Sequence, residues 1–117
     1  MKGKGMNFNV LIKRDEGLFL AHCLELDIVT TAPTVDQVKA DIYDLILAQV
    51  EYAFGNDNLD NLYHPAQREV WEEFFACKER ARPEIIKLPA PSKKKGSVIP
   101  PEIVASTCLD LGAFRVA

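Results

Sequence analysis

The chain has 117 residues, of which 48% are hydrophobic and 26% charged. This length suits one domain with one hydrophobic core, and the composition is that of a globular protein rather than a disordered one. The net charge of −3 excludes a strong overall attraction to the phosphates of nucleic acids.

The sequence also indicates the compartment. No apolar run approaches the roughly 18 to 20 residues that a membrane-spanning helix needs, and residues 1–5 contain no apolar segment like that of a signal peptide. We therefore expect a cytoplasmic protein without membrane contact. Cys23, Cys77 and Cys108 are odd in number and widely spaced, which fits neither a disulfide framework nor a zinc site. All three are predicted to be reduced, buried and apolar in role.

The first part of the chain has the pattern of three short strands. Phe8, Val10 and Ile12 alternate with other residues, which is the period of two expected of a strand with one buried face. Gly17 lies in the turn that follows and can adopt a positive φ angle. The expected strands are residues 6–13, 18–23 and 28–31.

Two helices are expected after the strands. Thr34 stands three residues before Gln37, the spacing of a capping box, and the apolar residues that follow recur at helical spacing over 34–54. The other side of this helix is expected to be polar and to carry Asp36, Lys39, Asp41, Asp44 and Glu51. A second helix is expected from about Pro65 to Arg82. The predicted fold class is α+β: an antiparallel three- to four-stranded sheet packed by one long helix, plus a second helix and an extended carboxy-terminal tail.

The carboxy-terminal third is expected to be less regular. Residues 84–88 could add a further strand, and the last segment could form a short helix from Pro101 and a terminal strand at 114–116. The expected organisation is a domain at 6–88, a Pro/Lys-rich linker at 89–97 and a carboxy-terminal segment at 98–117.

Lys93, Lys94 and Lys95 form the densest basic cluster of the chain. Their Pro- and Gly-containing surroundings favour a solvated linker. The alternative is a contact with phosphate, although three lysines would neutralise few phosphates. Binding to DNA therefore stays open.

The second predicted helix has more apolar side chains than one narrow stripe can hold. Its apolar residues Val70, Trp71, Phe74, Phe75 and Cys77 are too spread around the helix for one stripe. A large exposed aromatic patch formed by Trp71, Phe74 and Phe75 is disfavoured in a monomer. We expect a homodimer or larger homo-oligomer with these three residues at or near the contact. The alternative is that the segment from Val98 folds back over the helix.

No set of residues predicts catalysis. Asp15, Glu16, Glu25 and Asp27 flank the strands, where carboxylates can hold a divalent metal ion, but turns are the commoner use of such residues. The sequence contains no phosphate-binding glycine loop, no nucleophile elbow and no Cys-x-x-Cys pair. We expect no enzyme activity, no cofactor and no metal.

The histidines add no catalytic candidate. His22 and Cys23 are neighbours in a predicted strand, so their side chains point to opposite faces and cannot form a nucleophile–base pair. His64 precedes Pro65 at the expected start of the second helix, a position typical of a surface or capping residue.

The run from Phe8 to Leu26, followed by Thr34 to Val38, resembles the HicB-like antitoxins. The resemblance covers roughly residues 6–54. It implies a strand-strand-strand-helix-strand fold that is similar to part of ribonuclease H but has no nuclease activity. It also implies a protein that neutralises a small RNA-cleaving toxin by occluding it and that self-associates.

The chain departs from the family pattern at several places. Leu24 stands where the family often has Pro, residues 27–29 replace a Pro-Gly-Cys-like turn, and residues 32–33 replace a Gly before the helix. The usual carboxy-terminal DNA-binding module is not evident. Residues 98–103 instead faintly resemble half of an AbrB/MazE-type DNA-binding hairpin.

Three functions follow for testing. The first is a HicB-like antitoxin, or a protein derived from one, that binds a small toxin. The second is an orphan structural or regulatory homo-oligomer, and the third is a transcriptional regulator that uses the carboxy-terminal tail. A neighbouring gene for a small basic toxin would favour the first over the second.

Overall fold

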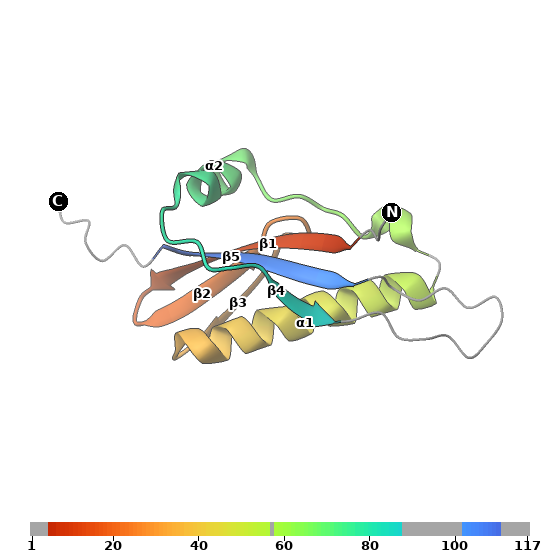
Figure 1. Ribbon diagram of the computed structural model, residues 1–117, viewed down its shortest axis with the longest axis horizontal. Helices are drawn as coiled ribbons and strands as arrows, with labels where there is room; N and C mark the ends of the chain where they lie inside the picture. The colour runs from red at the N-terminus through yellow and green to blue at the C-terminus, as the bar shows by residue number, and fades with distance from the viewer. Residues whose placement is uncertain (1–4, 57, 88–101, 111–117) are drawn as a thin grey trace.

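The computed structural model describes residues 5–56, 58–87 and 102–110. The strands form one five-stranded sheet in the order β3-β2-β1-β5-β4, with the long helix α1 on one face and the short helix α2 on the other (Figure 1). The elements in chain order are β1 (Met6–Asp15), β2 (Leu18–Cys23), β3 (Ile28–Ala32), α1 (Val35–Gly55), the 3₁₀ turn η1 (Leu59–Asn61), α2 (Arg68–Ala76), β4 (Glu84–Lys87) and β5 (Ile103–Asp110).

The three predicted amino-terminal strands are confirmed. A two-residue turn joins β1 to β2, and both of its residues, Glu16 and Gly17, have positive φ angles of 50° and 85°. Such a turn matches the twist of the strands that it connects. β3 then pairs antiparallel with β2, after Asp27 has reversed the chain with a φ of 56°.

The long helix α1 is confirmed as well. The Thr34 hydroxyl accepts a hydrogen bond from the Gln37 backbone N–H at 3.1 Å, which caps the first turn. Below the sheet, α1 packs mainly against β2 and β3. Its buried side chains recur at helical spacing and are Val38, Ile42, Ile46, Val50 and Ala53.

The expected antiparallel sheet of three or four strands is wrong in one respect, because the sheet is mixed. Residues 103–110 form β5, which lies parallel to β1 and antiparallel to β4. The short helix expected from Pro101 is therefore wrong over 103–110, and this segment belongs to the same sheet as the first strands. The linker at 89–97 and the terminal strand at 114–116 lie outside the described residues.

α2 spans only residues 68–76 of the predicted 65–82. The chain leaves the helix at Cys77 in an extended conformation, and the segment that follows runs beside β5. There the Leu109 N–H donates to the Glu79 carbonyl, and the Ala81 N–H donates to the Thr107 carbonyl. These bonds to β5 end the helix earlier than the apolar pattern indicated.

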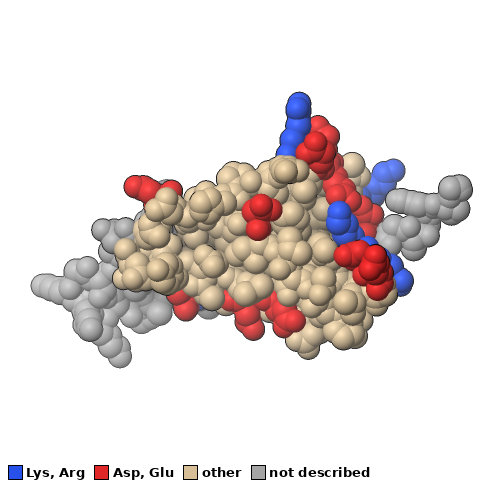
Figure 2. All heavy atoms as spheres, turned by 180° about the vertical axis from the view of Figure 1, so that it is seen from behind, with Lys and Arg blue, Asp and Glu red and all other residues tan. Residues whose placement is uncertain are grey.

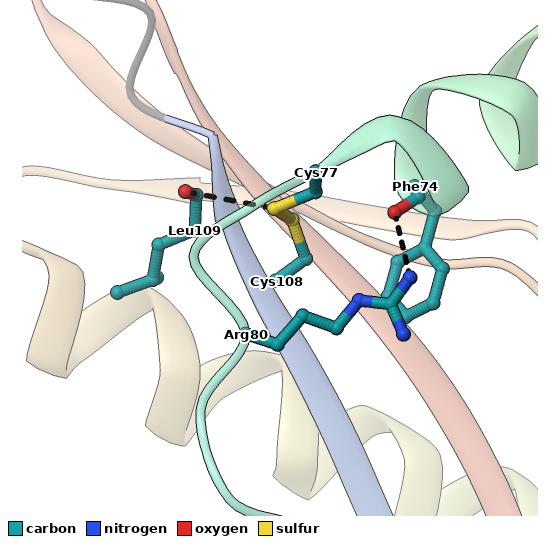
Figure 3. Close-up of a disulfide and its surroundings, with 5 residues drawn as sticks. All are labelled: Phe74, Cys77, Arg80, Cys108 and Leu109. Carbon is teal, nitrogen blue, oxygen red and sulfur yellow. Dashed lines mark hydrogen bonds between the residues drawn. A yellow bond between two sulfur atoms is a disulfide. The ribbon is translucent and has the colours of Figure 1, made fainter.

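Cys77 and Cys108 form a disulfide that joins the end of α2 to β5 (Figure 3). The prediction that all three cysteines are reduced is therefore wrong for this pair, whereas Cys23 is free and buried. Next to the disulfide, the Arg80 guanidinium lies over the Phe74 ring, 4.6 Å from its centroid. The Cys77–Cys108 pairing could not be predicted from the sequence, because it depends on the position of β5 in the sheet.

The two faces of β1 serve the two helices. Phe8, Val10 and Ile12 point towards α1 and belong to the larger core cluster. Leu11 points the other way, into a smaller cluster with Phe74. Within the described part of the chain, no helix is long and apolar enough to cross a membrane.

Candidate functional site

The four carboxylates that flank the strands do not converge. Asp15 and Glu16 lie at the β1–β2 turn, whereas Glu25 and Asp27 lie beyond the opposite end of β2, and a six-residue strand spans about 20 Å. Over residues 5–56, 58–87 and 102–110, no three His, Cys, Asp or Glu side chains are placed to hold a metal ion together.

Glu25 instead joins two parts of the fold. One carboxylate oxygen accepts the Asn9 backbone N–H at 2.7 Å, and the other accepts the Asn9 side-chain amide at 2.7 Å. Burial raises the pKa of Glu25 above its ordinary value, although these two hydrogen bonds oppose the shift. The residue therefore clamps β1 to the loop after β2.

His22 and Cys23 lie on opposite faces of β2, as the strand geometry predicts. His22 Nε2 lies 2.7 Å from an Asp27 carboxylate oxygen at the end of the same loop. Cys23 is fully buried in the core under α1, and burial raises the pKa of its thiol to about 12. The two side chains cannot act as a nucleophile and its base. His64 is exposed, and its backbone N–H donates to the Glu25 carbonyl.

The aromatic residues of α2 have different surroundings. Phe74 is only 1% exposed and packs on Leu11 and Leu24, so this chain's own core already covers it. Trp71 is partly buried in the same cluster, and Phe75 is 64% exposed. Of the three residues proposed for a contact, Phe75 is the one that is mainly open to a partner.

The solvent face of α1 carries carboxylates and no basic residue. We call this set, Asp36, Asp41, Asp44 and Glu51, the acidic face of α1. Lys39, the only basic residue of α1, lies on the flank of the helix towards β4, 3.3 Å from a Glu84 oxygen. Figure 2 shows acidic side chains along the middle of the lower edge of the molecule, where α1 lies, with no Lys or Arg among them.

An open groove of about 340 Å³ lies between α1 and β4. Among its lining residues, the Tyr43 hydroxyl donates to Glu84 at 2.8 Å, and it also lies 3.1 Å from the Thr107 hydroxyl. Burial raises the pKa of Tyr43 to about 12, and the bond from Tyr43 lowers the pKa of Glu84. The groove is lined by Ala40, Tyr43, Asp44, Leu47, Glu84, Ile85 and Ile86.

The sequence pattern predicts a polar helix face made of the carboxylates of α1 together with Lys39, whereas Lys39 lies on the flank towards β4. It indicates no groove, because the groove needs β4 beside α1. Lys93, Lys94 and Lys95 lie outside the described residues. Comparison of the chain with protein-family models, with curated proteins and with solved structures finds no match.

Proposed function

We propose that this chain is a HicB-like, non-catalytic binding protein that occludes a small RNA-cleaving toxin. The observation that carries the proposal is the acidic face of α1. A protein that binds RNA presents Lys and Arg side chains to the phosphates. A helix surface with four carboxylates competes for the same cationic side chains, although one of the four, Glu51, already pairs with Lys87 of β4 at 2.9 Å.

The groove between α1 and β4 lies beside this acidic face and offers a place for a side chain of the partner. Asp44 belongs to both, and Leu47, Ile85 and Ile86 supply apolar surface within reach of the carboxylates. A basic side chain of the toxin could place its charged end near Asp44 and its aliphatic stem on these residues, since long basic side chains bury their stems on apolar surface. Occlusion of this kind requires no chemistry from the binding protein.

The order of elements also supports the proposal. Three strands are followed by a long helix, and a later strand returns to pair with β1. The HicB-like resemblance of residues 6–54 implies the same strand-strand-strand-helix-strand order. The third candidate function, regulation of transcription through the carboxy-terminal tail, receives less support, because residues 103–110 are a strand inside the sheet and not a separate hairpin.

The test uses the small basic protein encoded beside this gene as the probe. Asp41→Lys/Asp44→Lys reverses two charges of the acidic face, and Asp15→Lys/Glu16→Lys makes the same change at the β1–β2 turn as the control. We expect the first variant to bind the probe at least tenfold more weakly and to fail to restore growth of cells that express it. The control should behave as the wild type does, and added salt should weaken wild-type binding.

Equal affinity of the two variants would contradict the assignment of the acidic face. The lack of any neighbouring gene for a small basic protein, or the lack of binding to its product, would contradict toxin occlusion itself. That outcome would favour the second candidate, a structural or regulatory homo-oligomer, for which the free edge of the sheet is the relevant observation.

A further inference from the structure

The two edges of the sheet are built differently. The β4 edge is charged and irregular: Glu84 pairs with Lys39 at 3.3 Å, Lys87 pairs with Glu51 at 2.9 Å, and the register of β4 shifts between Ile85 and Lys87. Charges and bulges at an edge are features that keep other strands from pairing with it. The β4 edge is therefore protected.

The β3 edge has none of these features. Residues Ile28–Ala32 include no charge and no proline, and they keep a regular register with β2 along the whole strand. In the described part of the chain, no backbone hydrogen bond reaches β3 from the side away from β2. β3 thus presents backbone N–H and C=O groups that can accept a further strand.

Exposed apolar side chains lie next to the β3 edge on both faces of the sheet. On the face that carries α2, Val29 is 47% exposed and Leu18 is 40% exposed. On the other face, Tyr43 of α1 points towards β4 and β5, so Leu45, about 200° further around the helix, points towards the β3 side. Leu45 is 38% exposed, and Tyr52, two turns later on the same flank, is 61% exposed.

Charge favours contact between two copies on this side. Because each chain carries a net charge of −3, two copies repel each other over most of their surfaces. Figure 2 views the molecule from the side opposite to β4, and the centre of this view is uncharged apart from one acidic group. Two copies that meet at the β3 edge therefore bring together surfaces that carry few charges near their centre.

We propose that β3 pairs with β3 of a second copy of this chain, antiparallel and around a two-fold axis at Thr30. This register pairs all five residues of the strand: Thr30 lies opposite Thr30 of the partner subunit, Val29 opposite Thr31 of the partner subunit, and Ile28 opposite Ala32 of the partner subunit. The sheet then runs continuously through both copies. β-branched residues facing each other across antiparallel strands are a stabilising combination.

The helices fit this arrangement. α1 packs against β3 and β2, and neighbouring strands are about 4.8 Å apart. The two copies of α1 would then lie about 10 to 14 Å apart across the axis, near the 8 to 10 Å at which helices pack. Leu45 and Tyr52 occupy the flank of α1 that faces this gap, so they extend the contact beyond the strands.

α2 is the less favourable surface for self-association. The sequence predicts a contact at Trp71, Phe74 and Phe75 because apolar side chains lie on more than one side of the predicted helix, but Phe74 is buried within its own chain. Phe75 remains as an exposed aromatic side chain, and single exposed apolar residues are common on monomers. Phe75→Ser therefore serves as the variant that should leave the association unchanged.

The test compares two double variants by sedimentation velocity at tens of micromolar. Val29→Lys/Thr31→Lys places like charges opposite each other at two symmetric places in the proposed register. Val29→Lys/Thr31→Glu places opposite charges there. Val29→Lys/Thr31→Lys also changes the net charge of each chain from −3 to −1. General charge repulsion between two copies would therefore be weaker, and by itself it would predict stronger association of this variant.

We expect the wild type, Phe75→Ser and Val29→Lys/Thr31→Glu to sediment with twice the 13.1 kDa mass of the chain. Val29→Lys/Thr31→Lys should sediment as a monomer with an unchanged far-ultraviolet circular dichroism spectrum. A monomeric wild type, or the same state for both double variants, would overturn the proposal. If neither double variant folds, hydrogen exchange of the wild type decides: slower exchange of the β3 amides at higher protein concentration supports the proposal, and no change overturns it.

Discussion

Removal of the Cys77–Cys108 disulfide should destabilise the chain by an amount that its loop length sets. The two residues are 31 positions apart. Release of a loop of this size increases the entropy of the unfolded chain and costs about 3 to 4 kcal/mol of stability. For a domain of this length, such a loss corresponds to a decrease in Tm of roughly 10 to 20 °C.

Thermal unfolding, followed by circular dichroism, checks this magnitude. The wild type is measured with and without a dithiol reductant, and Cys77→Ala/Cys108→Ala is measured in the same way as the control. Reductant should lower the Tm of the wild type and leave that of the variant unchanged. Thiol titration in denaturant should find one thiol per wild-type chain before reduction and three after it. A wild-type Tm that does not respond to reductant, with three thiols at the outset, would refute the reasoning.

Three further predictions concern buried groups. Burial raises the pKa of Glu25, so the folded chain binds this proton more tightly than the unfolded chain, and stability falls as the pH rises from the ordinary value of 4.5 through the raised value. Glu25→Gln should lack this decrease in urea unfolding at a series of pH values, and equal pH slopes for the two proteins would argue against it. Cys23, with its pKa raised to about 12, should react with iodoacetamide only in denaturant; labelling of the folded chain, read by mass spectrometry, would contradict this. Phe74→Ala should cost about 3 to 5 kcal/mol in urea unfolding, because it empties a buried aromatic site, whereas exposed Phe75→Ala should cost below about 0.5 kcal/mol; similar losses would show that the two side chains are not buried as described.

The elements with local signals could be predicted from the sequence. The alternation around Phe8, the turn at Gly17 and the cap at Thr34 each depend on residues that are close together in the chain. They led to three strands and the long helix, with ends within about two residues of those observed. The carboxylates of α1 were visible in the same way, as the polar side of a periodic pattern.

The features that depend on distant parts of the chain could not be predicted. β5 pairs with β1 although the two strands are far apart in the sequence, and no local sequence pattern predicts which strand will be the parallel neighbour of another. The early end of α2, the disulfide and the groove beside Tyr43 all follow from where β4 and β5 lie. Phe74 and Phe75 are neighbours in sequence, and only the position of the sheet decides which of them is buried.

The position of β5 has a consequence for synthesis of the protein on the ribosome. β1 is made early, but its parallel neighbour β5, which separates it from β4, is made after the other strands and helices that the structure describes. Until residues 103–110 emerge, β1 presents an open edge, and Phe74 lacks the part of its packing surface that Cys108 provides. Pairing between distant segments is slow, and an unpaired edge promotes aggregation. The nascent chain is thus most exposed to wrong strand pairing just before β5 is added.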